Sequence, residues 1–237
     1  ESKNVPVKVY APFGYFQEYK DQGIDVDYEF ALKISDIETS DWISLFELKF
    51  TEPIAVLIES TIEKLKGEGE KFGFEKIYEK IENEKNFSKE IKNSAIALFD
   101  AAKTWKVFDE EKGTSIKDLV NAGETTVIDL SMYASIGAFN VRSLIIGLVS
   151  KKIFNERMKA RKKEEIEAVS HGPNKKIRRE MPLIWIFIDE AHEFLPREEK
   201  TPATEALVQL LREGRQPGVS LVLATQQPGD RKSTRLN

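Results

Sequence analysis

Two adjacent carboxylates, Asp189 and Glu190, directly follow a run of six apolar residues, Leu183 to Ile188. A continuous apolar run of this length is typical of a strand buried on both faces, as in a parallel sheet that helices cover. Acids at the carboxyl end of such a strand lie at the edge where open α/β sheets bind their ligands. In a nucleotide hydrolase the first acid holds Mg²⁺ through water, and the second polarises the water that attacks the γ-phosphate. Two acids could instead simply solvate the exit of an ordinary strand.

A helix and a second strand follow the acid pair. Thr201-Pro202 favours a helix start, because a hydroxyl can cap the helix and proline suits the first helical position. Gly214 ends this helix, and residues 219–224 form a second apolar run. The apolar residues of the helix share one face; they are Ala203, Leu207, Leu210 and Leu211. A strand, a helix and a strand of this length predict a right-handed parallel βαβ unit.

The second strand ends in the polar residues Thr225, Gln226 and Gln227. In a parallel βαβ unit both strands end at the same edge of the sheet, so Thr225 and Gln226 would join Asp189 and Glu190 there. This convergence is harder to explain by packing than the acid pair alone. The sequence therefore favours a ligand site at this edge.

These residues resemble the second half of a HerA-type ATPase, a member of the HerA/FtsK group of hexameric DNA translocases. The similarity is dense from residue 182 to residue 230, and a weaker likeness covers residues 5–65 and 125–154. The motifs that carry it are Ile186–His192, Phe194–Arg197, Leu211–Arg215, Pro217-Gly218 and Leu223–Pro228. The resemblance implies ATP and Mg²⁺ as ligands, DNA and a nuclease as candidate partners, and assembly into a hexameric ring.

The resemblance also implies a role for each matching position. Asp189 resembles the Walker B aspartate, and Glu190 resembles the catalytic glutamate. Gln226 falls where the group places a sensor of the γ-phosphate, and Arg215 looks like the arginine finger that reaches a neighbouring subunit's nucleotide. Such a finger increases the rate of GTPases by ~10³ to 10⁵, although Arg215 could also be a cation at a helix C-terminus. We therefore expect catalysis from Glu190, Arg215 and Gln226, nucleotide binding by Asp189, Glu190 and Thr225, and Mg²⁺ binding through water by Asp189.

Two neighbouring polar residues receive no such role. One histidine beside an acid pair is not a metal site, so we expect His192 to be structural. Gln227 stands where the family commonly has a basic residue, so the resemblance implies no second sensor there.

No Gly-x-x-x-x-Gly-Lys-Ser/Thr segment occurs in the 237 residues. Without it the chain lacks the backbone amides and the lysine that hold the β- and γ-phosphates. In the family this Walker A loop would lie upstream of Val5. We therefore expect a fragment that hydrolyses ATP negligibly on its own, while the full-length parent is an ATPase. The basic residues 231–237 show no periodicity, and we expect them not to belong to the family sequence.

Composition narrows the classes of function. The chain has no cysteine, which excludes disulfides and thiol catalysis. It has only two histidines. No apolar run approaches the ~20 residues that span a bilayer, so we expect no membrane span and a cytoplasmic location.

The pattern of elements predicts an α/β fold with a parallel sheet and an inserted helical subdomain, and the resemblance implies that the core is an incomplete P-loop NTPase (RecA-like) core. Asp129 follows another apolar strand, Thr125 to Leu130, but we expect it to be structural because no second acid follows it. The predicted divisions are a partial ATPase core in residues 1–66, a helical insertion in 67–117, an ATPase core with the motifs in 118–230 and the tail in 231–237.

Residues 151–180 contain eleven lysines or arginines and five acidic residues, in a chain with a net charge of −4. Such a segment could bind nucleic-acid phosphates, since DNA affinity depends largely on cations. It could also be a solvated helix end, 155–167, followed by a loop. No aromatic residues alternate with the cations, so a stacking surface for single strands is not indicated.

The resulting hypothesis is an ATP-dependent DNA translocase or helicase of HerA type, in which a ring hydrolyses ATP between subunits. Alternatives are a conjugation-type ATPase of the same superfamily, and a non-catalytic module that binds nucleic acid or protein. Residues 189–192 also spell the DEAH helicase signature, but those enzymes have Ser-Ala-Thr after the next strand, where this chain has Thr225-Gln226-Gln227.

Overall fold

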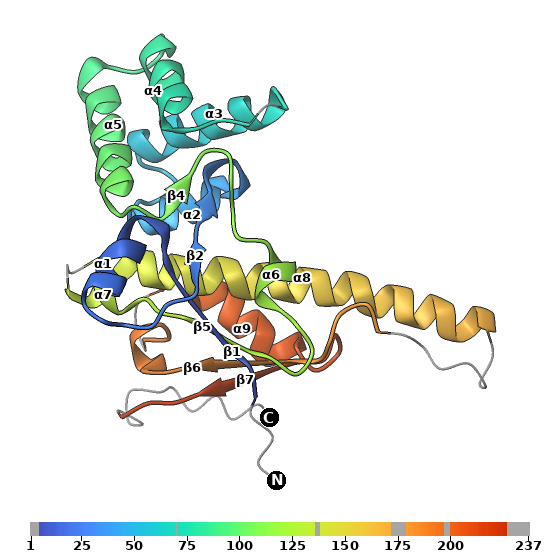
Figure 1. The fold of residues 1–237 in the computed structure, drawn as a ribbon. Helices are drawn as coiled ribbons and strands as arrows, with labels where there is room; N and C mark the ends of the chain where they lie inside the picture. Colours follow the sequence, from blue (N-terminus) through green and yellow to red (C-terminus); the bar gives the residue numbers. More distant parts are fainter. Residues whose placement is uncertain (1–4, 70, 136–137, 172–178, 197–199, 227–237) are drawn as a thin grey trace. The chain divides into compact units, whose positions relative to one another are not determined.

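The protein is a mixed α/β structure with small parallel sheets (Figure 1). The structure is a computed structural model, and it describes residues 5–69, 71–135, 138–171, 179–196 and 200–226. The chain splits into two compact units. Unit 1 comprises residues 1–6, 115–125 and 143–237, and unit 2 comprises residues 7–114 and 126–142.

Unit 2 contains two small sheets. Strand β1 (Val7–Pro12) lies between β2 (Tyr28–Phe30), to which it is parallel, and β5 (Thr125–Ile128). Strand β3 (Leu32–Lys33) pairs in parallel with β4 (Phe108–Asp109). Strands β2 and β3 follow one another closely in the chain but join different sheets. The reason lies at Ala31, whose N–H donates to Thr114 Oγ1 (2.9 Å) and whose carbonyl accepts from Thr114 N (2.9 Å).

The helices of unit 2 surround an aromatic cluster. Helices α3, α4 and α5 contact one another, and α2 contacts α3. Trp42 is fully buried and its ring contacts those of Phe46, Phe74, Phe99 and Phe108 at centroid distances of 5.1–6.5 Å. The bounds are α1 (Phe16–Asp21), α2 (Thr39–Leu45), α3 (Pro53–Gly67), α4 (Phe74–Asn83), α5 (Lys89–Thr104) and α7 (Ser131–Ser135), with 3-10 turns at Phe13–Tyr15 and Ile34–Asp36. Helices α4 and α5 therefore occupy much of the segment 67–117, whose division from its neighbours stays a prediction.

Unit 1 contains the predicted strand, helix and strand. Strand β6 (Ile184–Ile188) pairs in parallel with β7 (Val219–Leu223), and the register runs from Ile184 opposite Val219 to Ile188 opposite Leu223. Between them lie a 3-10 turn, η3 (Ala191–Glu193), and helix α9 (Thr204–Glu213). The unit also contains α6 (Ile116–Leu119) and most of α8 (Phe139–His171). The parallel strand–helix–strand prediction is confirmed in these elements.

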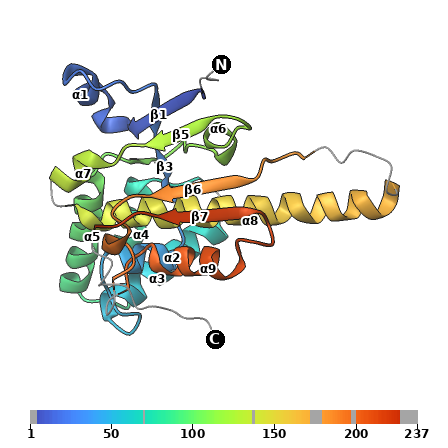
Figure 2. The same ribbon diagram turned by 90° about the horizontal axis from the view of Figure 1, so that it is seen from below.

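The prediction that both faces of β6 are buried is wrong. Helices α8 and α9 run beside the two strands (Figure 2), and Leu207 and Val219 are buried there. Side chains alternate between the faces of a strand, and on the opposite face Trp185 and Phe187 are 65% and 71% exposed. Within the described residues, a two-stranded sheet covered on one face explains this difference. A continuous apolar run does not reveal how many layers cover a strand.

Helix α9 approaches α8 closely at its own N-terminus. Ser143 Oγ accepts a hydrogen bond from Ala203 N (3.1 Å), and Ala203 is fully buried. One turn further along α8, a Cβ on Gly147 would lie 2.7 Å from Pro202 O, so glycine permits the approach. Thr201-Pro202, where the sequence predicted the helix start, thus lies where α9 packs against α8, and regular helix begins two residues later, at Thr204. Leu211, which was expected on the apolar face, is instead exposed.

Arg157 of α8 is buried at the amino ends of β6 and β7. Its Nε donates to Pro217 O (2.8 Å), and its Nη1 donates to Met181 O (2.9 Å) and Glu164 Oε1 (3.1 Å). Gly218 completes the adjoining turn with φ +81°, a conformation that favours glycine. This network fixes α8 to the starts of both strands. The interpretation of residues 155–167 as a solvated helix end is therefore wrong for Arg157 and Glu164, because both side chains are buried.

Among the described residues, no helix has the combination of length and apolar character that crossing a membrane requires.

Candidate functional site

The carboxyl ends of β6 and β7 bring together residues that are far apart in the sequence. Ala191 N donates to Ala224 O (2.8 Å), and Ala224 N donates to Ile188 O (2.9 Å). These backbone bonds extend the parallel pairing beyond the last strand residues. The side chains of Glu190 and His192 on one strand end, and of Thr225 and Gln226 on the other, meet at this edge.

Glu190 is the centre of this cluster. Its Oε1 accepts a hydrogen bond from Gln226 Nε2 (2.7 Å), and its backbone N donates to Asp189 Oδ1 (2.9 Å). Its backbone is left-handed, with φ 47° and ψ 43°. Such a conformation costs a non-glycine residue of order 1–3 kcal/mol and occurs most often at functional sites. The left-handed conformation of Glu190 turns the chain out of β6, and its carboxylate lies toward the end of β7.

His192 belongs to the same cluster. Its Nδ1 lies 3.0 Å from Thr225 Oγ1 and 3.3 Å from Glu190 Oε2. Glu190 Oε2 is buried and, among the described residues, has no hydrogen bond. Sequence reasoning gave His192 no place in the site. The sequence feature that could have indicated this is the position of His192 two residues after Glu190, because a 3-10 turn there brings the ring back toward the acid.

Asp189 is exposed at the edge of this cluster. Its Oδ1 accepts from Glu190 N, and the structure describes no hydrogen bond to its Oδ2. Mg²⁺ is commonly held by one or two carboxylates, several waters and substrate phosphates. One carboxylate with a free oxygen therefore fits a magnesium ion bound through water. Within the described residues, no group of three or more histidines and acids could hold a metal by itself.

Arg215 lies outside the cluster. It precedes β7, whereas Thr225 and Gln226 follow that strand. The five residues of β7 span about 16 Å, at about 3.3 Å per residue, so Arg215 lies at the opposite edge of the strand pair. The side chain is exposed, and the structure describes no ion pair for its guanidinium. This arginine is therefore not positioned to act on a ligand beside the Glu190 of its own chain.

Asp129 of unit 2 differs from Asp189 in its surroundings. Its Oδ1 accepts from Ser131 N (2.9 Å) at the start of α7 and from the hydroxyl of the fully buried Tyr19 (3.1 Å). Burial raises the pKa of Tyr19, so its hydroxyl stays protonated and continues to donate. These contacts agree with the structural role expected for Asp129.

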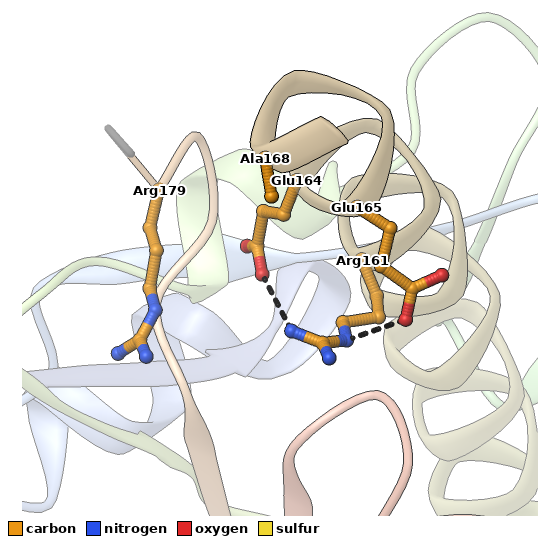
Figure 3. Close-up of a pocket in the computed structure, with 5 residues that line it drawn as sticks. All are labelled: Arg161, Glu164, Glu165, Ala168 and Arg179. Atoms are coloured by element: carbon orange, nitrogen blue, oxygen red, sulfur yellow. Dashed lines mark ion pairs between the residues drawn. The ribbon is translucent and has the colours of Figure 1, made fainter. Parts of the chain in front are cut away.

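A second feature of unit 1 is a pocket of about 480 Å³ beside the C-terminal half of α8 (Figure 3). It is lined by Arg161, Glu164, Glu165, Ala168 and Arg179. Arg161 pairs with Glu165 (3.0 Å) and Glu164 (3.7 Å), so acids offset the positive charge here.

Two further cations of this part of α8 are also paired. Lys159 contacts Glu156 (2.7 Å) and Lys163 contacts Glu180 (3.0 Å). Residues 172–178, which hold three of the cations in the basic segment, lie outside the described residues. A nucleic-acid face in residues 151–180 stays a prediction.

The predicted tail, residues 231–237, and Gln227 also lie outside the described residues.

The chain matches no known protein-family description and no protein in a search of curated sequences.

Proposed function

We propose that this chain is part of an ATP-dependent DNA translocase or helicase of HerA type. The observation that supports it best is the 2.7 Å hydrogen bond from Gln226 Nε2 to Glu190 Oε1. It joins a carboxylate and an amide from the ends of two adjacent parallel strands, at the edge where such sheets bind ligands. An acid that polarises water and an amide that contacts the γ-phosphate need this proximity.

The residues present fit a division of tasks in hydrolysis. Asp189 would hold Mg²⁺ through water, and the ion would neutralise charge on the phosphates. Glu190 would orient and polarise the attacking water once Gln226 is drawn toward the phosphate. Thr225, which contacts His192 at 3.0 Å, would lie beside the nucleotide. The Walker A motif does not occur in these 237 residues, so the proposal assigns those phosphate contacts to residues outside them.

The remaining parts of the proposal concern assembly. Arg215, exposed at the other end of β7, would act on the nucleotide of a neighbouring subunit in a hexameric ring. DNA would pass through the ring without base-specific contacts, and the protein would act in the cytoplasm.

The direct test is ATP hydrolysis by the longest natural protein that contains this chain, purified and assayed with Mg²⁺, with and without double-stranded DNA. We expect hydrolysis that requires Mg²⁺ and increases with DNA. If that protein neither binds nor hydrolyses ATP, the ATPase proposal fails and the alternative of a non-catalytic binding module replaces it. Hydrolysis that DNA does not change would retain the ATPase and remove the DNA translocase.

The role of Arg215 has its own test. Arg215→Ala should abolish turnover, and mixing with Glu190→Gln subunits should restore part of it, because each variant supplies the group that the other lacks. Arg212→Ala is the matched control, since Arg212 is also exposed and close in sequence. No recovery in the mixture would contradict action between subunits.

A further inference from the structure

We propose that His192 is a positioning residue: together with Gln226 it sets the orientation of the Glu190 carboxylate. The contact itself is independent of the proposed ATPase function, whereas its effect on turnover rests on that function.

The two oxygens of the Glu190 carboxylate have different surroundings. Gln226 Nε2 donates to Oε1, while Oε2 is buried without a hydrogen bond among the described residues. A buried carboxylate oxygen without a donor is unfavourable. His192 Nδ1 lies 3.3 Å from Oε2, within ion-pair distance, and a small rotation of the ring would complete a hydrogen bond. The imidazole is therefore the donor available to the second oxygen.

The imidazole is itself attached to the end of β7. Its Nδ1 is 3.0 Å from Thr225 Oγ1, and the side chain is only 17% exposed. The backbone bond from Ala191 N to Ala224 O (2.8 Å) holds the two segments together beside it. His192 thus spans both strand ends, so a movement of the end of β7 would be transmitted to Glu190 through Thr225 as well as through Gln226.

The proposed contact requires one tautomer of the ring, whereas the 3.0 Å contact with Thr225 Oγ1 is compatible with either. An ionised carboxylate only accepts hydrogen bonds, so Nδ1 must carry the proton that Oε2 receives. The Thr225 hydroxyl then shares this donor. In the proposed reaction Gln226 would leave Oε1 for the γ-phosphate, and His192 would keep the carboxylate in place through Oε2. Loss of His192 should therefore lower kcat and leave nucleotide binding unchanged.

The contact can be measured on this chain directly, because it has only two histidines. Long-range ¹H–¹⁵N NMR of the imidazole nitrogens, at a pH where both rings are neutral, should show the Nδ1–H tautomer for His192. Glu190→Ala should shift His192 toward the Nε2–H tautomer. An Nε2–H tautomer in the unaltered chain, or no response to Glu190→Ala, would overturn the proposal.

The consequence for turnover is tested in the longest natural protein that contains the chain. His192→Leu, which removes the donor, should lower kcat by roughly 10- to 100-fold with KM for ATP unchanged, as for other residues that orient a catalytic group. His192→Asn, whose amide can donate from near the Nδ1 position, should restore most of kcat. An unchanged kcat in His192→Leu, or equal losses in both variants, would contradict positioning.

Thr225→Val tests the link to β7, and Thr201→Val is its matched control. Thr201 is partly buried and its hydroxyl also bonds within unit 1, to Phe194 O (2.8 Å), but it does not contact the cluster. Only Thr225→Val should alter the His192 NMR signals, and equal changes in both variants would contradict the link. Absence of ATPase activity in the unaltered protein would remove the proposed function, while the NMR result would still decide the contact.

Discussion

The two ends of the β6–β7 pair carry polar clusters of opposite character. At the amino ends, Arg157 is 1% exposed and donates to Glu164, Met181 O and Pro217 O. At the carboxyl ends, Glu190 is 29% exposed, adopts a left-handed backbone and has one carboxylate oxygen without a hydrogen bond in the described structure. In the first cluster the two charged side chains are buried and paired with each other, whereas the second cluster is open and strained and has one carboxylate oxygen without a described hydrogen bond.

This difference separates a residue that holds the fold from one that is available for chemistry. A buried ion pair tolerates no loss of a partner, since the remaining charge would stay uncompensated. A partly paired carboxylate at a solvent-accessible edge can exchange a protein partner for water or a ligand. The Gln226–Glu190 bond is of that exchangeable kind, because both residues are accessible to solvent at the strand ends.

The largest expected change in stability follows loss of Arg157. Arg157→Leu removes the shorter ion pair of the buried Glu164, which keeps the longer contact with Arg161, and takes the donor from two backbone carbonyls. The free energy of unfolding should fall by about 3–5 kcal/mol, as measured by urea denaturation of the whole chain. The double variant Arg157→Met/Glu164→Leu removes both charges and should recover much of this loss. A loss below 1 kcal/mol for Arg157→Leu would contradict the account of the amino-end cluster.

A smaller effect should distinguish the two aspartates that follow apolar strands. Asp129→Ala removes the acceptor of Ser131 N and one partner of the Tyr19 hydroxyl, and it should lower the free energy of unfolding by about 1–3 kcal/mol. Asp189→Ala, at an exposed position, should change it by no more than about 0.5 kcal/mol. Chemical denaturation of both variants makes the comparison. Equal losses would show that Asp189 is also a structural residue.

A small effect is also expected at Arg161, which serves as the exposed counterpart of Arg157. Both arginines pair with Glu164, but the Arg161 side chain is 45% exposed and its contact with this acid is longer, at 3.7 Å. Arg161→Ala should change the free energy of unfolding by less than about 1 kcal/mol, because exposed ion pairs contribute little. A loss comparable to that of Arg157→Leu would show that burial does not distinguish the two pairs.

The sequence predicted the elements around the candidate site better than their surroundings. The apolar runs, the helix between them and the stop at Gly214 predicted β6, α9 and β7, because local periodicity and turn residues determine such elements. The exposed face of β6 was not predictable, since an apolar strand has the same sequence whether one or two layers cover it.

Side-chain partners were the least predictable feature. The burial of Arg157 depends on two carbonyls that are 24 and 60 residues away in the sequence. The contact of His192 with Thr225 likewise joins residues separated by 33 positions. No local pattern indicates such pairs, whereas the convergence of Glu190 and Gln226 followed from the parallel topology alone.

The central claim is that the carboxyl edge of β6 and β7 is the site of ATP hydrolysis. It is tested most directly by Glu190→Gln in the longest natural protein that contains this chain, with ATP turnover, nucleotide binding and unfolding measured on the same preparation. The account predicts a fall in turnover of at least about 10²-fold, with ATP binding retained and the free energy of unfolding within about 0.5 kcal/mol of the unaltered protein. Turnover equal to that of the unaltered protein would contradict the claim.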